Sequence, residues 1–250
     1  MRFIATLPAF LWLILAIPVQ ADTSNKNNIS LELETGALNF SRNDARIPGD
    51  TGTKFDILDL TGKGSSVFFR LNADWQLNSK HGLRLVLAPL AVDGTGNLSQ
   101  QTRFADTTFD AGPTKARYQF NTVKITYHYT FASGEDWRWR VGFTGLIRDA
   151  DIELQQGNKK DNDDNLGFAP LLHLYGEYTI NPKSRFSIDF DGLASPQGRA
   201  IDLAFKYRYD IDKHWHIGGG YRTVEGGVDN DTVYNFAWLH YAVFTLGYQF

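Results

Sequence analysis

Three side chains in the second half of the chain have residue types suited to acid–base chemistry. His173 lies on one expected strand, and Asp189 and Asp191 share one face of the next expected strand. A histidine held by a carboxylate can act as a general base that activates water, as hydrolysis requires. These three residues are the catalytic candidates of the sequence.

A larger set of charged side chains recurs at alternate positions of neighbouring segments. Both signs occur in near balance, as mutual pairing requires. One interpretation is a polar path or an acid–base site, and the other is a salt-bridge network that fills the interior. We favour the network, because structural ion pairs imitate active sites. The set comprises Arg138, Arg140, Glu177, Asp189, Asp202, Lys206, Arg208 and Arg222.

The expected turns indicate which of these charges meet. A turn at residues 210–214 would place Asp202 near Arg222 and Arg208 near His216. Across the 192–199 segment, Asp189 would come near Asp202. These pairs are predicted to close the lumen of a narrow barrel, because the interior of such a barrel is filled by side chains.

Two further motifs suggest ligands but fit a structural role better. The acidic run DNDDN at residues 161–165 offers carboxylate oxygens to Ca²⁺, but it lacks the spacing of an EF-hand loop. We expect a solvated external loop, with weak cation binding as the alternative, and no dedicated metal or cofactor. No helix is expected after the glycines at 218–220, so they predict a bend or a close backbone approach rather than a phosphate loop.

The composition excludes several classes of function. The chain has no cysteine, which excludes disulfides and thiol catalysis. Lys and Arg number 25 against 28 Asp and Glu, and loss of Arg2 with a signal peptide would leave 24 against 28, which moves the net charge from −3 to −4. A net negative charge does not favour binding to a polyanion, so we expect no nucleic-acid partner.

Most of the chain alternates between apolar and polar residues, which is the main sequence signal of a β-strand. Within SVFFRLNADWQL at 66–77, Val67 and Phe69 face one side and Arg70 faces the other. The parity of the first strand slips near Gly36, which a β-bulge would explain. Strands are expected at residues 29–41, 66–77, 83–87, 121–131, 137–143, 168–180, 185–195, 200–210, 215–225 and 233–250.

The connections between these strands alternate in length. Short turns such as NSKHG, ASGED, NPKS and DIDKH separate long polar segments at residues 42–65, 93–116 and 154–166. Short turns on one side and long loops on the other are typical of a transmembrane barrel with an even number of strands. With residues 55–60 assigned to the first external loop, we predict an all-β, transmembrane, antiparallel up-and-down β-barrel of about ten strands, with eight or twelve as alternatives.

Aromatic residues concentrate near the expected periplasmic ends of the strands. A soluble β-sandwich has no reason to place Tyr and Trp there, whereas a membrane barrel carries an aromatic girdle at the headgroup layer. The girdle is predicted to contain Tyr129, Phe131, Trp137, Trp139, Tyr178, Phe186, Tyr207, Tyr209, Trp215, Tyr248 and Phe250.

The N-terminal residues 1–21, MRFIATLPAFLWLILAIPVQA, have the layout of a cleaved secretory signal peptide. Arg2 supplies the positive charge, residues 3–17 are apolar, and a small-x-small triplet ends at Ala21. A retained N-terminal anchor is the alternative. Residues 22–250 are then predicted to form one barrel domain.

The last residues of the chain alternate up to a terminal aromatic side chain. With the signal peptide and the girdle, this pattern resembles bacterial outer-membrane β-barrel proteins. The segments ARIPGDTGTKFDI, GLIRDADIEL and DGLASPQGRAIDL resemble segments of small Gram-negative members without an assigned activity. The resemblance implies an outer-membrane location, contact with lipid and lipopolysaccharide, and a C-terminal strand read by the barrel-assembly machinery. The residues that carry this assembly signal are Phe244, Leu246, Tyr248 and Phe250.

Two classes of function follow from this interpretation. We favour a non-enzymatic surface or structural protein, or a small gated pore, because an open porin needs about 16 strands. The alternative is an outer-membrane hydrolase, either an omptin-like protease or a lipid A-modifying enzyme, with Asp and His residues at the rim. No omptin or deacylase motif is present in the sequence.

Overall fold

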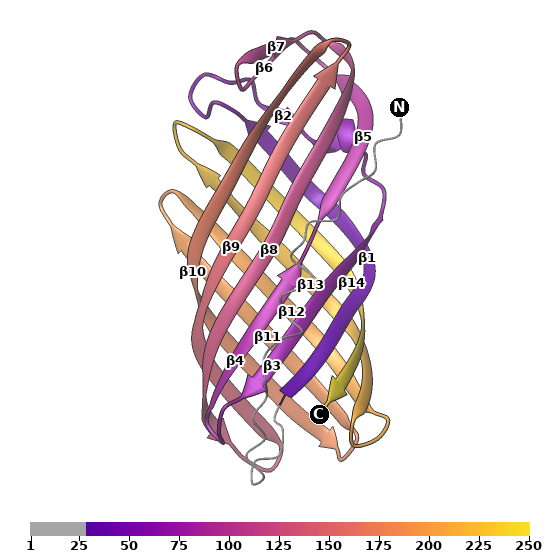
Figure 1. Ribbon diagram of the computed structural model, residues 1–250, viewed down its shortest axis with the longest axis vertical. Coiled ribbons are helices and arrows are strands. Elements are labelled where there is room, and N and C mark those ends of the chain that lie inside the picture. Colours follow the sequence, from indigo (N-terminus) through magenta and orange to yellow (C-terminus); the bar gives the residue numbers. More distant parts are fainter. Residues whose placement is uncertain (1–28) are drawn as a thin grey trace, which may run out of the picture.

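The computed structural model describes residues 29–250 and forms a closed barrel of ten wall strands (Figure 1). The expected signal peptide lies outside the described residues. The wall strands are β1 (Ile29–Arg46), β3 (Ser66–Gln76), β4 (His81–Ala88) continued by β5 (Ala91–Leu98), β8 (Gly112–Ser133), β9 (Trp137–Gln156), β10 (Lys159–Asn181), β11 (Ser184–Ser195), β12 (Gly198–Asp210), β13 (Trp215–Asp229) and β14 (Tyr234–Gln249).

Pairing of the first strand with the last closes the barrel. Every neighbouring pair is antiparallel, and β1 pairs with β14 from Ser30 opposite Gln249 to Arg46 opposite Tyr234. Closure satisfies the backbone groups that an edge strand would leave unpaired in lipid. The predicted ten-strand, up-and-down antiparallel barrel is therefore confirmed. No helix within residues 29–250 is long and apolar enough to cross a membrane.

The outward face carries an exposed apolar belt around the barrel. Successive side chains of a strand point to opposite faces, so the alternation in sequence becomes an apolar exterior and a more polar interior. The end where the C-terminus lies is here called the base. There the rings of Trp137 and Trp139 stack with their centroids 5.4 Å apart, and the rings of Trp215 and Tyr248 meet edge to face with their centroids 4.9 Å apart. Exposed members of the belt include Leu33, Ile125, Phe143, Leu172 and Phe244.

The opposite end, here called the rim, is built differently from the prediction (Figure 1). Residues 93–116 and 154–166 are not wholly loops: β5 pairs with β8, and β9 pairs with β10 as far as Gln156 opposite Lys159. The acidic run at 161–165 therefore lies on β10. At the rim, β10 is partly or fully exposed from Lys159 to Phe168, so its polar composition resembles that of a loop, whereas the inward side chains of β8 and β9 are buried in an apolar core.

The first external connection folds into the rim. It contains β2 (Phe55–Asp56) and the short helix α1 (Leu58–Thr61), and its buried Ile57 and Leu60 join one apolar core. α1 packs on β5, where any side chain at Gly96 would collide with the Asp59 carbonyl oxygen. The same core receives side chains from the hairpin of β6 (Thr102–Phe104) and β7 (Thr107–Phe109).

The irregularity of the first strand lies later than predicted. The register of β1 against β14 shifts between Phe40 and Arg42, not at Gly36. The parity slip in sequence has another cause: Leu38 faces the lumen and is fully buried in the apolar core. The lumen is thus apolar near the rim and charged farther down, so one strand changes its inward chemistry along its length.

Candidate functional site

A set of buried charges crosses the lumen at mid-height and is here called the charge layer. It consists of Glu34, Arg70, Lys124, Asp202 and Arg222, which come from β1, β3, β8, β12 and β13 and are each at most 7% exposed. Strands from different parts of the wall therefore contribute to one cluster.

Ion pairs connect the charge layer across the lumen. Asp202 accepts hydrogen bonds from Arg222 and, at 2.6 Å, from Lys124, and it lies 3.1 Å from Arg70. Glu34 accepts a 3.0 Å hydrogen bond from Arg222. Buried charges persist only when they are paired and hydrogen-bonded, and this arrangement meets that condition.

The catalytic candidates of the sequence adjoin the charge layer. His173 Nδ1 lies 2.8 Å from Asp191 and 3.8 Å from Asp189. Asp191 also accepts hydrogen bonds from Lys124 at 2.9 Å and from Thr144 at 2.8 Å. His173 is buried, and neither cavity described below is lined by it. The trio is brought together, but its carboxylates are engaged and its imidazole does not face a substrate cavity.

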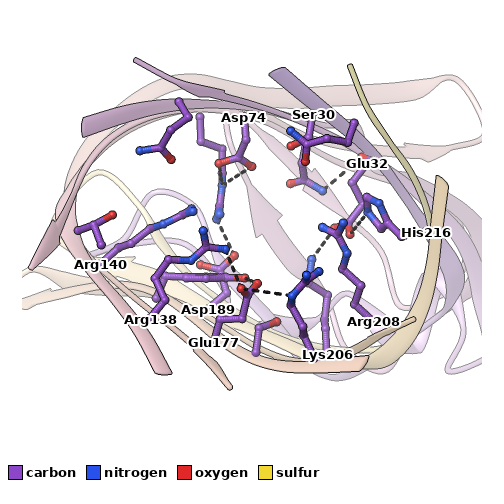
Figure 2. Close-up of a pocket in the computed structure, with 18 of the residues that line it drawn as sticks. Ser30, Glu32, Asp74, Arg138, Arg140, Glu177, Asp189, Lys206, Arg208 and His216 are labelled. Atoms are coloured by element: carbon purple, nitrogen blue, oxygen red, sulfur yellow. Dashed lines mark hydrogen bonds and ion pairs between the residues drawn. The ribbon is translucent and has the colours of Figure 1, made fainter. Parts of the chain in front are cut away.

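A polar cavity of about 450 Å³ lies between the charge layer and the base and is here called the base cavity (Figure 2). Arg138 donates to Glu177 at 2.6 Å, and Lys206 donates to Glu32 at 2.6 Å. Ion pairs therefore line the base cavity and also form the charge layer above it. Arg84 links two further carboxylates, Asp74 at 3.0 Å and Asp189 at 2.7 Å.

Two predicted pairings differ from the observed register, and one predicted lumen charge lacks a carboxylate partner within residues 29–250. Asp202 lies directly opposite Asp191, and Asp189 is its diagonal neighbour two residues along β11, because the β11–β12 turn is centred at residues 196–197. Arg208 lies opposite Gly218 and donates to Asp210 at 2.7 Å instead of meeting His216. Arg140 has no carboxylate partner within residues 29–250, and its guanidinium lies 5.1 Å from the Tyr175 ring.

The predicted set of lumen charges omitted several residues that contact it. Glu32 and Glu34 alternate with apolar residues in β1, and Arg70 and Lys124 do the same in β3 and β8. Their position at every second residue, on the same face of the strand as the other inward charges, was the sequence signal that could have identified them. The slip in β1 parity obscured the two glutamates, although they supply the carboxylates for Lys206 and Arg222.

The acidic run on β10 does not assemble a metal site. No group of three or more His, Cys, Asp or Glu side chains in residues 29–250 is placed to hold a metal ion. Partial burial, together with the neighbouring carboxylates Asp164, Asp151 and Asp161, raises the pKa of Asp163 above its usual value. These carboxylates repel one another at the solvated end of the hairpin.

Comparisons with known proteins identify the architecture. No protein-family profile matches the chain, and no curated sequence matches it. The outer-membrane protease OmpT from Escherichia coli is similar in structure, with a TM-score of 0.55 and 11% identity over 89% of this chain and 97% of OmpT. The attachment invasion locus protein Ail of Yersinia pestis scores 0.41 at 8% identity, over 89% of this chain and 99% of Ail.

A third similar structure is an outer-membrane channel from Pseudomonas putida F1, with a TM-score of 0.42 and 8% identity over 92% of this chain and all of that chain. These proteins differ in their named activities, and identities this low establish the fold alone. The chain has the fold of the bacterial outer-membrane β-barrel proteins.

Proposed function

We propose that this protein is a non-enzymatic surface or structural barrel of the outer membrane whose lumen is closed by the charge layer. The base would face the periplasm and the rim the exterior, after export with a cleaved signal peptide. One observation carries the proposal: paired, buried charges from five wall strands separate the base cavity from the space toward the rim. Such a network blocks ions while it holds opposite walls together.

The hydrolase alternative has less support. A general base must lie within hydrogen-bonding reach of a substrate or its attacking water. His173 is buried at mid-height, and Asp191 already accepts from Lys124 and Thr144. The likeness to OmpT concerns the fold and supplies no catalytic residue.

The closed lumen predicts an electrically silent wild type. In planar lipid bilayers the purified barrel should show no steady single-channel conductance. The double variant Lys124→Ala/Asp202→Ala should conduct, because these two residues form a 2.6 Å ion pair in the charge layer that closes the lumen in this proposal. The control Lys159→Ala/Asp110→Ala removes an exposed ion pair at the rim that lines neither side of the charge layer and should remain silent. Steady conductance of the wild type would replace this proposal with a small pore.

We propose that the outward apolar belt contacts lipid and lipopolysaccharide and that the C-terminal strand is read by the barrel-assembly machinery. Phe244 and Leu246 of β14 are exposed on the outward face, and Phe250, directly after β14, is exposed as well. An outward row of this kind is available to another protein before the barrel inserts.

Deletion of Phe250 should slow insertion in cells but leave refolding in detergent nearly intact. Burial of one terminal ring contributes only about 1–3 kcal/mol to the free energy of folding, which is too little to decide whether the barrel forms. Heat-dependent gel mobility measures folding in both settings. Phe143→Ala, which removes an exposed ring in mid-strand, is the control and should not slow insertion. Equal losses in cells and in detergent would show that Phe250 acts through stability instead.

A further inference from the structure

A second cavity of about 540 Å³, here called the rim cavity, lies between the charge layer and the rim. Arg70, Lys124, Asp202 and Arg222 of the charge layer form its floor. Its volume is within the range of about 300–1,000 Å³ that is typical of small-molecule sites. The function proposed above does not require this cavity.

The walls of the rim cavity are mainly apolar, unlike those of the base cavity. Inward-facing side chains of β3, β8, β10, β13 and β14 line it, among them Phe68, Tyr118, Leu171, Val224 and Leu239. Leu193 of β11 also faces inward, yet it is 43% exposed, so apolar surface is open to solvent inside the barrel. An apolar molecule that covered this surface would be stabilised by its burial.

One cation in the wall of the rim cavity lacks a carboxylate partner. Arg148 of β9 forms no ion pair within the described part of the chain, and its Nη2 donates to the Asn165 side-chain oxygen at 2.9 Å. A Cβ atom at Gly167 would lie 3.0 Å from the same Nη2, so glycine leaves room for the guanidinium. Every cation of the charge layer, by contrast, is paired with a carboxylate. Arg148 is therefore available to an anionic group.

A second polar group beside the cavity also lacks a partner. Tyr118 lines the cavity and is 1% exposed, and its hydroxyl has no hydrogen-bond partner within residues 29–250. A buried hydroxyl without a partner is costly. An acceptor on a bound molecule that came within reach of this hydroxyl would satisfy it.

A notch in the wall connects the rim cavity with the exterior. The β10–β11 ladder stops at Leu172 opposite Gly192, although β10 continues to Lys159 while β11 turns at residues 196–197. Pro170, which has no amide hydrogen to donate, lies just beyond the last pair. Phe168 lines the cavity at this notch and is 71% exposed (Figure 1 shows β10 rising past the β11–β12 hairpin).

We propose that the rim cavity binds a small molecule with an apolar body and one anionic group, which enters through the β10–β11 notch and places its anion at Arg148. The apolar walls select the body of the ligand, and the guanidinium selects a carboxylate or a similar anion. Arginine suits this role because its planar fork makes charge-assisted hydrogen bonds to carboxylates.

Photolabelling of the barrel in lipid nanodiscs tests this inference. The probe is a twelve-carbon carboxylic acid bearing a diazirine, and its methyl ester is the uncharged comparison. Peptide mass spectrometry should place the acid on residues of the rim cavity, and unlabelled dodecanoate should compete with it. Adducts confined to outward residues such as Phe143 and Phe244, at the lipid-facing belt, would overturn the proposal.

Two variants and a control separate the anion contact from the cavity. Arg148→Gln should raise the Kd of competing dodecanoate about tenfold or more and leave labelling by the ester unchanged, because a hydrogen bond to a charged group is lost. Leu193→Trp should fill the cavity and reduce labelling by both probes. Arg117→Gln alters an exposed, outward arginine of β8 that does not line the rim cavity and should change neither result. An unchanged Kd for Arg148→Gln would remove Arg148 from the site and overturn the proposal.

Discussion

Asp202→Ala is expected to lower the free energy of unfolding by about 3–5 kcal/mol, because removal of one partner leaves buried charges uncompensated. Asp202 contacts Arg70, Lys124 and Arg222, so three cations lose a carboxylate at once. Urea unfolding of the barrel in lipid vesicles measures the change. Arg222→Ala should be similarly costly, since it leaves Glu34 with less compensation.

The double variant Asp202→Ala/Arg222→Ala shows whether the two residues act as one unit. Its loss should be smaller than the sum of the two single losses, because the second substitution removes a charge that the first left unpaired. The outward pair Arg199–Glu225 joins the same two strands and provides a matched control. An exposed pair of this kind contributes at most about 1 kcal/mol. Additive, small losses at Asp202 and Arg222 would show that water screens the lumen charges.

Gly220→Val is expected to prevent the barrel from folding, whereas Gly219→Val should be tolerated. Gly220 faces the lumen opposite Lys206, and a Cβ atom there would collide with the Phe205 carbonyl oxygen. At Gly219, on the outward face, the nearest atom is the Val243 carbonyl oxygen at 3.2 Å. The two substitutions add the same side chain to adjacent residues and differ in the face on which it lies.

The expected cost at Gly220 is about 3 kcal/mol or more, because the obstructing atoms belong to the backbone and cannot adopt another rotamer. Refolding yield, read from heat-dependent gel mobility, and urea unfolding in vesicles measure both variants. Equal behaviour of the two variants would show that the close approach of β12 and β13 relaxes without difficulty. This close approach is the role predicted for the glycines at 218–220 in place of phosphate binding.

The interior contains two chemically different cavities separated by one ionic partition. The base cavity is lined by ion pairs such as Arg138–Glu177, while the rim cavity is lined mainly by apolar side chains. In the function proposed above, the ionic layer between them restricts the passage of ions and of apolar molecules. The division places an apolar space near the rim above a layer of buried charges.

The alternation in the sequence was sufficient to predict the wall of the barrel. Side-chain direction in a strand repeats every second residue, so patterns such as that of residues 66–77 identify both the strand and its lipid face without knowledge of its neighbours. An even number of strands with short turns at one end then favoured about ten strands over eight or twelve, and the closed ten-strand barrel confirms this prediction. The inward parity of Asp202 and Arg222 was visible for the same local reason.

The tertiary structure alone determined which inward residues meet and where the cavities lie. Glu34 contacts Arg222 although 188 positions separate them, because closure of β14 onto β1 and the strand register bring them to one height. The sequence likewise did not show that β10 extends farther toward the rim than β11, or that Arg148 has no carboxylate partner within residues 29–250. Side-chain parity is a property of one strand, whereas pairing across a lumen depends on the stagger and closure of all the strands together.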